Sequence, residues 1–230
     1  MRYVSRTENP NAIAGIFLLI LLAVFAGPNV LPRLLSDQFP FVYEGVPCDW
    51  LRAGDQRAIH QSLLGRAVSN RVNPPISLTI KTSDFPAAID GPLVVWITVT
   101  NNTIGTIPIL VTTERVVIGT GTGESGLGIA FNNVPVPAAA QNVGGYPETQ
   151  IRLLGPRQRC VHRALIQPNQ FAPSDLSIVS TGSGSVKAFY RNNTSGTASA
   201  VGTGVAIYGD QGLWVGVTES DSVDIPVSVQ

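Results

Sequence analysis

The chain has 230 residues, of which 44% are hydrophobic and 13% are charged, so its composition is apolar for a soluble protein. Lysine plus arginine and aspartate plus glutamate both number 15, and this balance excludes an overall field that would favour nucleic acid or an acidic surface as a partner. The length predicts one domain of ordinary size, with or without attached segments, and the apolar excess points to a segment that is not soluble.

Residues 1–35 are predicted to form an N-terminal transmembrane anchor. No charged residue occurs between Glu8 and Arg33. A helix over residues 10–27 would be about 27 Å long, close to the roughly 30 Å apolar core of a bilayer. The first partner expected from the sequence is therefore the lipid bilayer, crossed once.

A secretory signal peptide is the alternative for this segment. Arg2 and Arg6 make a basic start, and residues 24–26 provide a small-residue cleavage site. Both interpretations export the rest of the chain. For an uncleaved span, two arginines before it and one after it favour a cytoplasmic N-terminus and an extracytoplasmic C-terminal domain at the cell membrane.

Residues 36–75 are predicted to be a membrane-proximal segment that carries an interface for partner proteins. Aromatic residues gather in its first part, where their amphipathic rings favour the edge of a bilayer or the surface of a partner. The same rings would also serve to cover the side of the following domain. These residues are Phe39, Phe41, Tyr43 and Trp50.

A short amphipathic helix is predicted in the second part of this segment, from residue 54 or 55 to about residue 68. Ala58, Ile59 and Leu63 recur at helical spacing, while Arg57 and Gln61 lie on other faces. Two consecutive prolines at 74 and 75 then end the helical pattern. The helix would present one apolar face.

From residue 76 to residue 230 the sequence predicts short strands separated by turn residues. They cover residues 77–82, 93–102, 107–113, 115–119, 127–131, 150–154, 160–167, 176–180, 185–192, 204–209, 213–217 and 223–229. Within 93–102, Trp96 and Thr98 alternate with Ile97 and Val99, which is the period of a half-buried strand. Strands at this spacing predict a mainly β domain, an antiparallel β-sandwich.

Two stretches of this region resemble bacterial extracytoplasmic immunoglobulin-like domains. PLVVWITVTNNTIGTIPIL, residues 92–110, is similar to their opening strands, and YGDQGLWVGVTESDSVDIPVSV, residues 208–229, is similar to their final hairpin. The resemblance implies an immunoglobulin-like sandwich. It carries over no functional residue, because the shared features are alternation and turns.

A glycine-rich stretch raises the question of nucleotide binding. Gly121, Gly123 and Gly126 have the spacing of the dinucleotide-binding G-x-G-x-x-G motif, which works only where a strand turns into a helix. Pro135 and Pro137 forbid a regular helix soon after the third glycine. The sequence therefore predicts a flexible loop or a hairpin over residues 119–128, and neither a nucleotide nor another cofactor is expected.

Cys48 and Cys160 are the only cysteines. Both follow the predicted span, and a small, even number of cysteines in an oxidising compartment favours a disulfide. The bridge would join the membrane-proximal segment to the β domain. A metal site is the alternative, because Cys160 and His162 share one face of a predicted strand, and Cys48 and His60 would complete a Cys₂His₂ set.

No catalytic site is predicted, and the protein is not expected to be an enzyme. His162 is close in sequence to Cys160, but no third residue that would orient such a pair is identifiable. Asp221 and Asp224 surround the last turn, where aspartate ordinarily starts the turn.

Two functions follow from this organisation. The first is a non-catalytic, single-pass accessory or scaffold subunit of a larger membrane complex, with other membrane-protein subunits as partners. The alternative is a free-standing surface or periplasmic module that binds sugar, peptide or cell wall, with glycine-rich loops forming its site.

Overall fold

The computed structural model describes residues 15, 45–54, 73–83, 92–112, 115–119, 121–140, 145–170, 183–196 and 211–226. The chain divides into two units, Met1–Glu44 and Gly45–Gln230. In its described residues the second unit is mainly β, as predicted, and it contains three sheets and three short 3-10 turns.

Eleven strands and three 3-10 turns are described in the second unit. The strands are β1 (Val46–Pro47), β2 (Ile76–Thr82), β3 (Leu93–Asn101), β4 (Ile107–Leu110), β5 (Val117–Ile118), β6 (Gly126–Phe131), β7 (Ile151–Leu154), β8 (Arg159–Ile166), β9 (Ser183–Asn192), β10 (Gly216–Glu219) and β11 (Val223–Pro226). The 3-10 turns are η1 (Cys48–Trp50), η2 (Glu148–Gln150) and η3 (Pro168–Gln170).

The first sheet has the strand order β1-β8-β3-β2. Strand β3 pairs antiparallel with β2 and β8, so Ile97 lies opposite Ile80 on one side and His162 on the other. Along β3 every second residue is buried, and the residues between them are half-buried. The predicted alternation of this strand is confirmed, since one face of the sheet packs on the core and the other faces outward.

The second sheet has β9 at its centre, with β6 and then β5 on one side. Strands β10 and β11 both pair antiparallel with β9 on its other side, so they are two parts of one edge strand, and the final hairpin expected from the resemblance is not formed. Glu219 pairs with Phe189, and Val223 pairs with Val186. Between these two pairs the edge strand has one residue more than β9, and this extra residue makes a β-bulge. Ser220 closes this gap, because its backbone N–H donates to the Ala188 carbonyl and its hydroxyl accepts from the Ala188 N–H.

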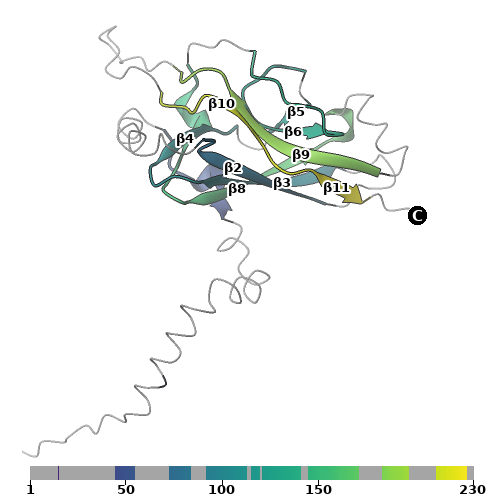
Figure 1. The fold of residues 1–230 in the computed structure, drawn as a ribbon, viewed down its shortest axis with the longest axis horizontal. Coiled ribbons are helices and arrows are strands. Elements are labelled where there is room, and N and C mark those ends of the chain that lie inside the picture. The colour runs from purple at the N-terminus through teal and green to yellow at the C-terminus, as the bar shows by residue number, and fades with distance from the viewer. Residues whose placement is uncertain are drawn as a thin grey trace, which may run out of the picture. The chain divides into compact units, whose positions relative to one another are not determined.

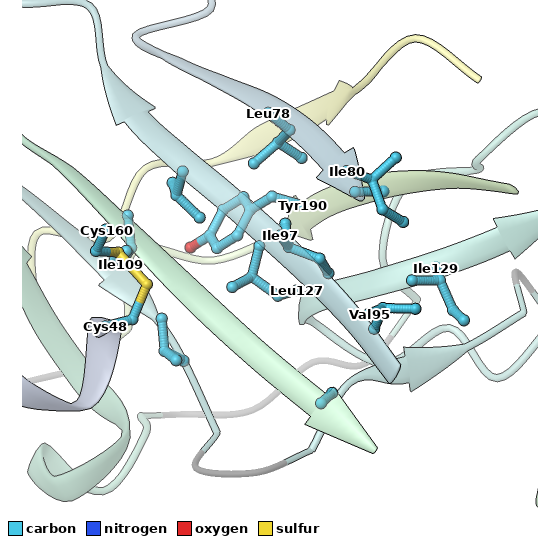
Figure 2. Close-up of a cluster of buried hydrophobic side chains, with 14 of the residues drawn as sticks. Cys48, Leu78, Ile80, Val95, Ile97, Ile109, Leu127, Ile129, Cys160 and Tyr190 are labelled. Atoms are coloured by element: carbon cyan, nitrogen blue, oxygen red, sulfur yellow. A yellow bond between two sulfur atoms is a disulfide. The ribbon is translucent and has the colours of Figure 1, made fainter. Parts of the chain in front are cut away.

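The two larger sheets lie face to face and share one hydrophobic core (Figure 1). Figure 2 shows the Tyr190 ring of β9 among side chains from both sheets, with Ile97 from the first and Leu127 from the second. Its hydroxyl accepts the backbone N–H of Leu110 at 3.2 Å, and its ring stacks on Trp214. Burial raises the pKa of Tyr190, so the phenol stays neutral and donor-competent inside the core.

The third sheet is the antiparallel pair β4 and β7, and it joins the N-terminal end of the second unit to the core. Beyond β1, the Leu153 N–H donates to the Arg52 carbonyl and the Gly54 N–H donates to the Ile151 carbonyl. Residues 45–54 thus belong to the hydrogen-bonded β unit, although the sequence places them in the membrane-proximal segment.

Several predicted features lie outside the described residues. They are the short helix beyond residue 54, three of the four aromatic interface residues (Phe39, Phe41 and Tyr43) and the transmembrane span except for Gly15, which is helical. In the part of the chain that the structure describes, no helix is long and apolar enough to cross a membrane. The predicted span therefore receives no support from the structure.

A buried asparagine joins two turns of the domain. The Nδ2 group of Asn101 donates to the carbonyl oxygens of Gly105, Leu154 and Gly155 at 2.7, 3.1 and 2.8 Å. Its Oδ1 atom accepts from the backbone N–H and the hydroxyl of Thr103. The side chain thus connects the end of β3 with the turn between β7 and β8.

We expect Asn101→Ala to lower the free energy of unfolding by about 2–4 kcal/mol, because it removes hydrogen bonds from three backbone carbonyl groups and from the Thr103 N–H. The measurement is urea unfolding followed by circular dichroism. Asn102→Ala is the matched control, since that side chain makes an exposed hydrogen bond with Ser77, and it should cost less than about 1 kcal/mol. Equal losses in both variants would contradict the role given to Asn101.

Candidate functional site

The predicted disulfide is confirmed. Cys48 in η1 and Cys160 on β8 are joined with an S–S distance of 2.09 Å, and both side chains are buried (Figure 2). Beside the bridge, β1 pairs parallel with the start of β8, Val46 opposite Cys160. The bridge and the short pairing fix the residues that immediately follow Glu44 onto the first sheet.

The turn that carries the disulfide also orients an exposed tryptophan. The Leu51 N–H donates to the Cys48 carbonyl, and the side chains of both residues enter the core. In a 3-10 turn residues three apart lie on the same side, so Trp50 points away from the core. Trp50 is 78% exposed, the largest exposed fraction among the described large hydrophobic residues.

Replacing both cysteines by serine should lower the free energy of unfolding by about 3–5 kcal/mol, because the bridge closes a long loop in the unfolded chain. The sequence separation of 112 residues places the bridge at the upper end of that range. Urea unfolding of the double variant, compared with the native protein with and without reductant, measures the difference. A native protein whose stability does not respond to reductant would contradict this prediction.

His162 is buried on the inner face of β8, on the side that carries Cys160, as the sequence predicts. Its Nε2 atom lies 3.0 Å from the backbone carbonyl oxygen of Arg115. Because a carbonyl oxygen only accepts, Nε2 carries the proton of this hydrogen bond. Burial lowers the pKa of His162, while the Arg115 carbonyl and the charge of Asp49 oppose that shift. A neutral histidine thus joins β8 to the segment that leads into β5.

The alternative Cys₂His₂ metal site is wrong, because both sulfur atoms are bound to each other and offer no thiolate. His60, its fourth member, lies outside the described residues. Among the residues that are described, no group of three or more histidine, cysteine, aspartate or glutamate side chains is arranged to hold a metal.

The lowered pKa of His162 makes stability depend on pH. The unfolded chain binds a proton near pH 6.5, whereas the native protein does so only at lower pH, so the free energy of unfolding should decrease from about pH 7.5 to about pH 5. The variant His162→Gln keeps an N–H donor and does not titrate, so its stability should change less over this interval. Urea unfolding midpoints measured at several pH values test this prediction. The variant His60→Gln, measured in parallel, shows how much of the pH dependence comes from the other histidine. Equal pH dependence in the native protein and His162→Gln would contradict the prediction.

The glycine-rich stretch forms a loop between β5 and β6. A strand and not a helix begins at Gly126, so a loop between two strands is confirmed, but it is shorter than predicted because residues 126–128 belong to β6. The hairpin alternative is wrong, because β5 pairs parallel with β6. Gly123 and Gly126 have φ values of 68° and 122°, which side chains disfavour, and the Gly123 carbonyl accepts the Ala140 N–H at 2.9 Å. We name residues 121–125 the glycine loop.

Strand β9 contacts the glycine loop through the side chain of Arg191. Arg191 has no exposed surface, and its Nε donates to the Glu124 carbonyl at 2.7 Å. Its guanidinium carbon lies 5.0 Å from the centroid of the buried Phe189 ring. Burial lowers the pKa of Arg191, and the Glu124 carboxylate opposes that shift, so the guanidinium remains charged. A fixed positive charge therefore lies under the loop.

Two neighbouring clefts border the glycine loop, with cavity volumes of about 250 and 260 Å³. Arg115, Val116, Val117 and Glu124 line both of them. We name the first the loop cleft, and its polar lining consists of Thr112, Arg115, Glu124, Ser125, Tyr146 and Gln150. The second also contacts the end of β8, including Leu165.

The sequence analysis did not identify the residues of the loop cleft. They come from three parts of the chain, the segment that leads into β5, the glycine loop with the start of β6 and the turn before β7, and the polar ones among them are ordinary residues near turns. One signal was present in β9: Lys187, Phe189 and Arg191 alternate with the core residues, and a phenylalanine among them indicates that the outer face is also covered.

No protein-family model matches the chain, and no curated protein matches its sequence.

Proposed function

We propose that the protein is a non-catalytic, single-pass accessory or scaffold subunit of a larger membrane complex. In this proposal residues 1–35 hold it in the cell membrane with the N-terminus in the cytoplasm, and the β unit lies on the extracytoplasmic side. Its partners are other membrane-protein subunits.

An immunoglobulin-like sandwich is the finer fold class that we propose for the β unit. Sheets of this class order their strands A-B-E and G-F-C. Taking β2, β3, β6, β8 and β9 as A, B, C, E and F, with β10 and β11 as G, the observed orders β2-β3-β8 and β10-β9-β6 agree with that scheme. The disulfide departs from it, because it joins the segment before β2 to β8 and does not link the B and F strands.

The extracytoplasmic placement is supported by the disulfide. Buried bridges of this kind persist in oxidising compartments and are rare in the cytosol. Cys48 lies three residues after Gly45, where the second unit starts, and the bridge joins it to β8 of the first sheet. A pulling force or a contact at the N-terminal end of this unit is therefore transmitted through the bridge to the first sheet.

The observation that carries the proposal is the position of Trp50. A large aromatic side chain held outward by a covalently fixed turn loses little conformational freedom when a partner covers it, which is the property of an interface anchor. Its exposed fraction of 78% leaves most of its apolar surface without a contact in the described residues. Trp50 is also the member of the predicted aromatic interface that the structure describes.

Trp50→Ala should reduce the amount of co-purified partner subunits about tenfold or more, in line with the loss of one aromatic anchor. The measurement is gentle detergent extraction of the full chain followed by native mass analysis. Ile104→Ala is the matched control, because Ile104 is 62% exposed and lies in the turn after β3.

The two outcomes separate the two functions that the sequence leaves open. Stoichiometric partners that depend on Trp50 and not on Ile104 support the accessory subunit. A native chain that migrates alone and monodisperse overturns it and favours the free-standing binding module.

A further inference from the structure

We propose that the loop cleft is a binding site for a neutral saccharide of one or two sugar rings. The site does not include Trp50: it uses the glycine loop, the segment before β5 and the turn before β7. It would bind a ligand whether or not the chain is held in a complex.

The described lining of the loop cleft contains one basic and one acidic side chain. They are Arg115 and Glu124, and they form no ion pair with each other in the described structure. Arg115 is exposed and Glu124 is half-buried, so both side chains are accessible to a ligand. One cation and one anion give no preference for a charged ligand, but each planar group offers two hydrogen bonds to neighbouring hydroxyls of a sugar ring.

The other polar groups suit a ligand with many hydroxyls. Thr112 and Gln150 contribute a hydroxyl and an amide to the lining. The Ser125 hydroxyl is buried at the wall without a hydrogen-bond partner in the described residues, which is unfavourable. In the proposed complex this hydroxyl rotates about the Cα–Cβ bond toward a sugar hydroxyl, which supplies the missing partner.

The size and the apolar part of the cleft agree with a small ligand. Its volume of about 250 Å³ is below the roughly 300–1,000 Å³ of pockets for drug-sized molecules, so it suits one or two rings. Val116, Val117 and Leu127 provide an apolar wall, and Tyr146 adds an aromatic ring. Such surfaces pack against the C–H faces of a sugar.

The walls of the site are held in place before a ligand binds. Arg191 fixes the glycine loop from below through the Glu124 carbonyl, and Gly123 is tied to Ala140. Tyr146 is fixed in two ways, because its backbone exchanges hydrogen bonds with the Gln211 side chain at 2.8 and 2.7 Å and its hydroxyl donates to Asn192. Pre-organisation of this kind lowers the entropic cost of binding.

Saturation-transfer NMR and calorimetric titration of the full chain in detergent micelles test the proposal. The probes are glucose, galactose, mannose, N-acetylglucosamine, maltose and cellobiose, with L-alanine and glucuronate as zwitterionic and anionic comparisons. We expect saturable binding of at least one neutral sugar. Glu124→Gln and Arg115→Gln should each weaken it about tenfold or more, because each removes charge-assisted hydrogen bonds.

Matched control variants keep the result interpretable. Glu148→Gln changes an exposed carboxylate that lines neither cleft, and it should alter the affinity less than about twofold. Arg115→Gln leaves the backbone carbonyl that accepts from His162, so the fold around β5 is retained. The absence of saturable sugar binding overturns the proposal. Sugar binding that Glu124→Gln and Arg115→Gln leave unchanged, or binding of the zwitterionic or anionic probe alone, also overturns it.

Discussion

Strand β9 is the element on which the rest of the described structure depends, because it is hydrogen-bonded on both edges and buried on both faces. Its inner face places Tyr190 between the two sheets, where its hydroxyl accepts the backbone N–H of Leu110 at the end of β4. Its outer face carries Phe189 and Arg191, which support the glycine loop. One strand therefore builds the core and at the same time positions the walls of the loop cleft.

Burial of the outer face has a chemical consequence. A guanidinium without exposed surface must be satisfied by its surroundings, and Arg191 donates to the glycine loop from within the domain. The Lys187 ammonium forms an ion pair with Glu219, whose other carboxylate oxygen accepts the Val136 N–H. The Arg191 cation thus attaches the glycine loop to the sheet, and the Glu219 carboxylate, paired with Lys187, attaches the segment at Val136. Both contacts are charged hydrogen bonds, which are stronger than neutral ones.

Trp50, which carries the proposed partner interface, is not among the residues that line the loop cleft. Substitutions at Trp50 and at Glu124 therefore change different parts of the described structure, and partner assembly and ligand binding are separable by mutation.

The alternation of apolar and polar residues in the sequence determined which segments become strands and which of their faces point inward. Strands β3 and β8 are examples, because in both the buried residues alternate along the strand. This alternation depends only on residues that are neighbours in the chain. The presence of two cysteines in a chain that is predicted to be exported also predicted the disulfide. The tertiary structure alone decided that β10 and β11 continue one edge of β9 and that β5 runs parallel to β6. It alone brought Arg115, Glu124 and Tyr146 to one cleft. Their meeting depends on the pairing of strands far apart in the chain, and periodicity within a strand carries no information about which distant strand becomes its neighbour.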